Sequence, residues 1–176
     1  MTGIPDAKLK ELLIEDGLMT PEQFEGVLKE ASGTGKSVME LLLAKNFITE
    51  NYFEELHSRY LRVPLIRLDT AKIDLSVLSL LPEEVARQRR VMPFRKNTDG
   101  SIDTAMEDPS NLVDIEYLTR YLNAKINPYL APSGELAKGF SLYARESAQN
   151  FKKIIEDNAV ASLRVGAKTA EEGAVE

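Results

Sequence analysis

Apolar and polar positions recur with the spacing of an α-helix over the first part of the chain, and the arrangement occurs twice. Residues 11–20 (ELLIEDGLMT) align with residues 40–49 (ELLLAKNFIT). In each copy a leucine-rich stretch precedes Gly17 or Asn46, residue types that accept a left-handed backbone just after a helix end. The pattern predicts two related helical hairpins, and therefore four short helices between residues 6 and 61.

Each copy continues with a signal for its next helix. Thr20 is placed to cap that helix, Pro21 suits the first helical position, and Gln23 suits a capping box. Phe24 in the first copy and Phe53 in the second then open an apolar face with helical spacing. We therefore expect a helix from Pro21 onward and a related helix in the second copy.

The pattern changes after residue 62 to short β-prone runs between helices. Residues 63–68 predict a strand or an extended connector, and the turn signal NTDG at 97–100 predicts a β-hairpin. The remaining expected elements are helices at 75–81 and 83–90, strands at 91–96, 102–106 and 125–131, an amphipathic helix carrying Leu112, Ile115, Leu118 and Leu122, and a last helix capped by Ser133 and running to about Asn150.

These elements define an α+β fold, in which helices and sheet form segregated layers. We expect a helical repeat subdomain at residues 1–62, made of the two related hairpins. A small ββαβα unit should form an α+β subdomain at residues 63–150. The signals weaken past Phe151 and the chain ends in an acidic stretch, so residues 151–176 are expected to be a flexible linker or tail.

The charge balance of the chain narrows the classes of partner. Its 176 residues carry a formal net charge of −6 at pH 7, whereas binders of nucleic acid and of anionic membranes need clustered cations. We therefore expect neither a nucleic-acid partner nor direct membrane insertion. No apolar run approaches the roughly 18 residues of a membrane span, and the first residues lack the order of a signal peptide. This indicates a cytoplasmic protein.

The residue inventory offers little catalytic chemistry. The chain has no cysteine and a single histidine, His57, so it has neither a thiolate nor a histidine pair for a metal ion. Nothing places a nucleophile near His57 for a serine–histidine–carboxylate triad. The sequence thus predicts no catalytic residues, no metal site and no cofactor, and the protein is not expected to be an enzyme.

Residues 33–37 (GTGKS) look like a phosphate-binding loop. Such a loop begins with a glycine or alanine, and here Glu30 holds that position, where its carboxylate would meet the negative charge of the nucleotide. The residues before the loop show helical spacing and end at Gly33, instead of forming the buried strand that a phosphate loop follows. We interpret the segment as a linker between the two hairpins.

A series of short motifs follows the repeat: VPL at 63–65, LPEEVA at 81–86, VMPF at 91–94, AMEDPSN at 105–111 and PYLA at 128–131. In this order, and together with the repeat, they resemble the amino-terminal (MshEN or type II secretion E amino-terminal) domain of the type II secretion and type IV pilus assembly ATPases. The resemblance covers roughly residues 8 to 145. Members of that family continue into a catalytic domain with Walker motifs, and a free-standing module and a part of a longer protein both fit this chain.

Some domains of that family bind cyclic di-GMP through the two repeats, with arginine and backbone groups meeting phosphate and base. Here Lys8 and Ser37 stand where the arginines would, and Ala31 and Tyr60 replace the glutamines. A lysine ammonium is a point charge and cannot form the two parallel hydrogen bonds that an arginine guanidinium makes with a phosphate. The nucleotide-binding residues that the resemblance implies are Lys8, Leu9, Leu13, Gly17, Leu18, Met19, Phe24 and Leu28 in the first copy and Val38, Leu42, Phe47, Ile48 and Phe53 in the second.

Two hypotheses of function follow. The first is a non-catalytic adaptor or regulatory module that binds a protein partner, a platform or motility component of a secretion or pilus system. The resemblance implies docking to the cytoplasmic part of an inner-membrane platform protein. The alternative is a cyclic di-GMP sensor that uses the two degenerate repeats. Lys10 and Met39, which replace glycines of the motif, favour the first hypothesis because they crowd a backbone meant to approach a ligand.

Three arginines, Arg87, Arg89 and Arg90, form the best candidate for a partner-binding site, because they are the clearest cluster of positive charge in the sequence. We also expect a partner face to show as an exposed apolar patch with a polar rim.

Overall fold

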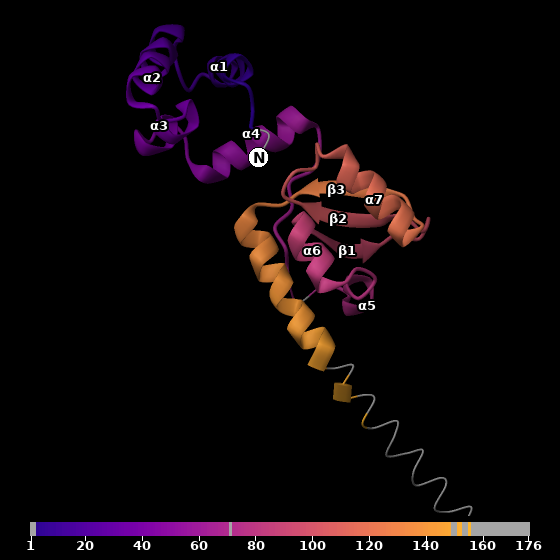
Figure 1. Ribbon diagram of the computed structural model, residues 1–176. Helices are drawn as coiled ribbons and strands as arrows, with labels where there is room; N and C mark the ends of the chain where they lie inside the picture. The colour runs from indigo at the N-terminus through magenta and orange to yellow at the C-terminus, as the bar shows by residue number, and fades with distance from the viewer. Residues whose placement is uncertain (1–2, 71, 149–150, 153–154, 156–176) are drawn as a thin grey trace, which may run out of the picture.

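The computed structural model describes residues 3–70, 72–148, 151–152 and 155 of the chain. Its first part consists of four helices, which lie together at one end of the molecule, and α4 leads from them toward the sheet (Figure 1). This confirms the two predicted helical hairpins. The helices are α1 (Asp6–Glu15), α2 (Pro21–Thr34), α3 (Val38–Ala44) and α4 (Glu50–Leu61).

Local capping explains where these helices start and stop. Thr20 and Ser37 each form a capping box with the residue three positions on, and Thr49 caps α4. Gly17 and Asn46 take the left-handed backbone expected of them, with φ of 71° and 56°. These caps satisfy helix-end amides that would otherwise lack a partner.

The linker reading of residues 33–37 is confirmed, with one correction. Helix α2 continues through Gly33 to Thr34, and Gly35 ends it with φ of 68°. The predicted stop at Gly33 was wrong because the left-handed residue that ends the helix comes two positions later, with only Lys36 between it and the Ser37 cap of α3. Glu30 lies on α2 and pairs with Lys45, so it takes no part in a phosphate loop.

The second part of the chain is a three-stranded sheet with helices. Strands β1 and β2 form the predicted antiparallel hairpin, and β3 pairs parallel to β2, which gives the order β1-β2-β3. A further helix covers residues 133–148 and runs past α6 away from the four-helix end (Figure 1). The elements are α5 (Leu75–Leu78), α6 (Glu83–Arg89), β1 (Val91–Lys96), β2 (Ile102–Met106), α7 (Leu112–Leu122) and β3 (Ile126–Leu130).

The segment between the two parts is an extended connector. Residues 63–68 form no regular strand, but Leu65 makes an isolated bridge to Leu130 of β3. The amide of Ile66 donates to the carbonyl of Leu130 at 2.9 Å, and the amide of Leu130 donates to the carbonyl of Pro64 at 2.9 Å. The connector is therefore attached to the free edge of β3.

The predicted cap at Ser133 was wrong. The last helix begins at that residue, and the carbonyl of Pro132 accepts its first amides, those of Glu135 and Leu136. The Ser133 hydroxyl donates instead to the carboxylate of Glu107. Because Ser133 already lies within the first turn, its side chain reaches a neighbouring loop more easily than its own helix. The predicted end near Asn150 lies outside the described residues.

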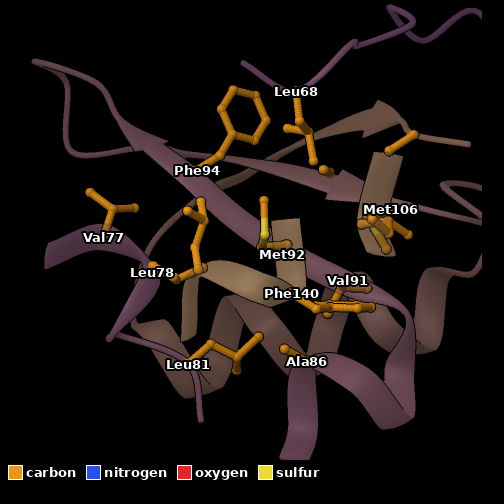
Figure 2. Close-up of a cluster of buried hydrophobic side chains, with 14 of the residues drawn as sticks. Leu68, Val77, Leu78, Leu81, Ala86, Val91, Met92, Phe94, Met106 and Phe140 are labelled. Carbon is orange, nitrogen blue, oxygen red and sulfur yellow. The ribbon is translucent and has the colours of Figure 1, made fainter. Parts of the chain in front are cut away.

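Buried apolar side chains form two clusters, one among α1–α4 and one around the sheet. In the sheet cluster, Phe140 of the last helix lies near Met92 of β1 and Ala86 of α6 (Figure 2). A Cβ atom on Gly139 would lie 2.5 Å from Sδ of Met92, so glycine allows the last helix to approach the sheet closely. The two clusters support a division near residue 62, which stays a prediction, as does the tail at 151–176, most of which lies outside the described residues.

Candidate functional site

A cleft of about 380 Å³ lies between the helical repeats and the sheet. One wall comes from α3 and α4, and the other from the loops that follow β2 and β3. The first turn of the last helix also contributes to this second wall. The lining residues are Met39, Leu43, Glu50, Phe53, Glu54 and His57 on the first wall, and Glu107, Asp108, Leu130, Ala131, Pro132, Ser133 and Gly134 on the second.

The interior of the cleft is apolar. Leu130 and Ala131 are buried, and Met39, Leu43 and Phe53 are half-buried with part of their surface toward the cleft. The Phe53 ring stacks on His57, with centroids 5.7 Å apart and an angle of 19° between the planes. Such a surface suits apolar or aromatic groups.

The remainder of the lining is acidic. Carboxylates of Glu50, Glu54, Glu107 and Asp108 border the cleft, and among the described residues that line it none is lysine or arginine. Arg67 pairs with Glu54 and Arg90 pairs with Glu107 from outside the lining. Glu50 has no ion pair within the described part of the chain. The cleft therefore carries excess negative charge.

Glu107 stays ionised at neutral pH. Burial raises the pKa of this carboxyl, but the hydrogen bonds from Arg90 and Ser133 lower it by more, so the pKa lies below its ordinary value. The carboxylate thus remains an acceptor at the edge of the cleft.

The structure places most of the predicted nucleotide-binding residues inside the core of the helical repeats. A ligand would have to separate the helices to reach these side chains, so their part in binding stays a prediction. Leu28, Phe47 and Phe53 are half-buried, and Leu18 and Gly17 are exposed at the turn after α1. The buried ones are Leu9, Leu13, Met19, Phe24, Val38, Leu42 and Ile48.

The lysines at the first motif already have partners. Lys8 pairs with Glu11 at 2.8 Å, and Lys10 pairs with Glu25 at 2.5 Å. These are exposed pairs of small energetic value. They nevertheless hold the ammonium groups beside carboxylates, which disfavours a phosphate at the same place.

Each arginine of the candidate partner site already contacts other side chains of the same chain. Arg87 pairs with Glu83, and its guanidinium lies 5.0 Å from the centre of the Phe140 ring. Arg90 lies 5.6 Å from the same ring. Arg89 pairs with Asp114 and lies 3.8 Å from the centre of the Tyr117 ring. These contacts anchor the arginines, and their part in partner binding stays a prediction.

An exposed apolar face on α7 adjoins Arg89, and sequence reasoning missed it. Leu112 was expected on the inward face, but it is 69% exposed, and Val113 and Tyr121 are 72% and 48% exposed. Leu112 points outward because it precedes the buried Leu118 by six residues, which places it about 120° around the helix from that side chain. The spacing of Val113, Tyr117 and Tyr121 on one side of the helix was the available signal.

The family model described as the MshEN domain matches residues 61–150, and the chain belongs to this family. The match covers the connector, the sheet and the last helix. Within the described residues no helix is both long and apolar enough to cross a membrane.

Among curated proteins, the chain is similar to two type IV pilus assembly ATPases named PilB. It is 26% identical to that of Myxococcus xanthus over 153 residues, which are 85% of this chain and 26% of the relative. It is 25% identical to that of Thermus thermophilus over 142 residues, which are 80% of this chain and 15% of the relative. The chain thus spans about a quarter or less of the length of these relatives.

Among solved structures, the chain is similar to MshE with cdg (cyclic di-GMP). The sequence identity is 30% and the TM-score 0.62, over 77% of this chain and 97% of the other. The amino-terminal domain of XpsE also aligns, at 16% identity and a TM-score of 0.43 over 80% of this chain and 97% of that one. The MshE match confirms the α+β fold and the resemblance to amino-terminal domains of such ATPases.

Proposed function

We propose that this chain is a cytoplasmic, non-catalytic regulatory module that docks a protein partner in a type IV pilus or type II secretion system. The observation that carries the proposal is a surface of α7 beside Arg89, where Val113 and Tyr121 are exposed and Tyr117 is half-buried. Tyrosine and arginine are the residue types that most often dominate the energy of protein interfaces. The face also has the form expected of a partner site, an exposed apolar patch with charged neighbours.

The geometry of this face supports docking of a folded partner. The Tyr117 and Tyr121 rings stack, with centroids 5.6 Å apart and 18° between their planes. Arg89 lies over the Tyr117 ring and pairs with Asp114. Side chains held in place in this way lose little conformational entropy when a partner binds.

The partner that the family resemblance implies is the cytoplasmic part of an inner-membrane platform protein. We expect that domain, taken from the same organism, to bind the purified chain in biolayer interferometry. Val113→Asp should weaken binding at least about tenfold, because a partner that covers the apolar patch would bury the new charge. Leu80→Asp is the matched control, since Leu80 is also exposed but lies before α6. Equal affinity for both variants would reject the α7 face.

Cyclic di-GMP sensing is the second candidate function. It is supported by the likeness to MshE with cyclic di-GMP. It is also supported by the cleft, because Met39 and Phe53 of the second repeat line it. Against it, the cleft is bordered by four carboxylates, which would repel the two phosphates of the ligand.

We expect isothermal titration of cyclic di-GMP into the wild-type chain to give no measurable heat. A variant with the motif residues restored, Lys8→Arg, Lys10→Gly, Ser37→Arg and Met39→Gly, should gain binding, because arginine forks and close backbone approach return. A circular dichroism melt checks that this variant is folded. Micromolar binding by the wild type, weakened by Lys8→Ala, would favour the sensor over the adaptor.

A further inference from the structure

We propose that the cleft between α4 and the sheet binds a cationic amphipathic peptide segment of a partner protein, with a large apolar side chain in the cleft and lysine or arginine side chains on its acidic border. The inference deepens the proposed function and rests on it, because it names the chemistry of a second partner contact.

The size and lining of the cleft define the apolar part of this segment. A volume of about 380 Å³ is at the low end for a small-molecule pocket, and it suits one or two large side chains. Phe53 and Met39 line the cleft on the helical side, and Leu130 and Ala131 line it on the sheet side. An aliphatic or aromatic side chain between these walls would bury apolar surface from both parts of the molecule.

The charges define the rest of the segment. Glu50 and Glu54 lie on α4, one turn apart, and Glu107 and Asp108 lie on the loop after β2. The arginine partners of Glu54 and Glu107 offset two of these charges. No ion pair within the described residues offsets Glu50, so a cationic group would gain most beside it. The carboxylates at this border would repel an anionic ligand. An uncharged apolar segment would gain no electrostatic attraction from them.

Selection from a random displayed peptide library tests the proposal. The library is selected on the wild-type chain and depleted on Gly134→Trp, a variant designed to fill the cleft. Gly134 is exposed, and a Cβ atom there meets nothing within 4 Å, so the variant should fold. Gly33→Trp, on α2, is the size-matched control, because it too has open space. We expect enriched peptides with a large apolar residue flanked by lysine or arginine.

Titration of one enriched peptide then tests the charge directly. Glu50→Lys should weaken binding roughly tenfold, while Glu55→Lys, an equal charge change on α4 outside the cleft, should leave it almost unchanged. Enrichment of acidic or purely polar peptides, no enrichment at all, or equal losses for the two lysine variants would overturn the proposal. If the peptide experiments fail but Val113→Asp still weakens binding of the platform domain, the proposed function stands and only the cleft proposal is rejected. If the peptide experiments succeed but Val113→Asp does not weaken binding of the platform domain, only the α7 face is rejected.

Discussion

Phe140→Ala is expected to lower the free energy of unfolding of the sheet cluster by about 3–5 kcal/mol. Phe140 is 1% exposed and lies between the sheet and α6. Its truncation would leave a cavity next to Gly139, where the backbone is held close to Met92 and cannot easily collapse to fill it. It would also remove the ring that Arg87 and Arg90 cover.

Phe24→Ala is the matched variant in the other cluster, because Phe24 is also 1% exposed. Urea unfolding followed by circular dichroism measures both variants. If the clusters are separate cooperative units, the urea curve should show two transitions. Each variant should then lower the free energy of unfolding of only one of them, by about 3–5 kcal/mol. A single transition that both variants shift equally would show that the helical repeats and the sheet unfold together, and would contradict the division near residue 62.

Asp103→Leu is expected to destabilise the sheet by about 3 kcal/mol, because the hydrogen bonds between a charged acceptor and two half-buried side-chain amides are lost. Asp103 is 2% exposed and accepts from the side-chain amides of Asn97 and Asn127 at 2.7 and 2.9 Å. Arg95 donates to its other oxygen at 2.7 Å. Because Arg95 is largely exposed, its ion pair contributes less than the two amide bonds.

The same carboxylate predicts a loss of stability in acid. Burial raises the pKa of Asp103, but hydrogen bonds from Asn127, Asn97 and Arg95 lower it by more, and the pKa lies below its ordinary 3.8. A group whose pKa is lowered by folding contributes its full stability above the ordinary value and loses it as the pH falls through the folded-state value.

Chemical unfolding measured from neutral pH down to below 3.8 checks this expectation. The wild type should lose stability over the acid part of that range. Asp103→Asn should be less stable at neutral pH but lose less on acidification, because it has no proton to gain. An equal acid slope in both proteins would show that other carboxyls, such as Glu107, carry the effect.

The helices of the repeats could be predicted because their signals are local. Thr20, Pro21 and Gln23 act within a single turn, and Gly17 acts through its own backbone conformation. The strands at 91–96 and 102–106 could be predicted for the same reason, since a turn of four residues sets their pairing.

The cleft could not be predicted, because it depends on how two distant parts of the chain face each other. Nothing near Phe53 in the sequence indicates that Leu130 or Gly134 lies opposite. The family motif drew attention to apolar residues such as Leu13 and Leu42, which the repeats bury for their own stability. Leu112 was misplaced because it lies six residues before the buried Leu118, so the two side chains do not share one face of the helix.

The hydrogen bonds of the connector shorten the joint between the two parts of the molecule. Pro64 and Ile66 are bonded to Leu130, and on the other side the amide of Val63 donates to the carbonyl of Ser58 at 3.2 Å. Any rotation between the parts would therefore act through a few bonds near Arg62, with α4 as a lever of about 18 Å beyond them, and it would strain the pair between Arg67 of the connector and Glu54 of α4. A turn of about 10° at this pivot would carry Glu50, at the far end of the lever, by about 3 Å. The width of the acidic cleft would then change with the angle between the two parts. A peptide segment bound in the cleft would hold that angle at one value.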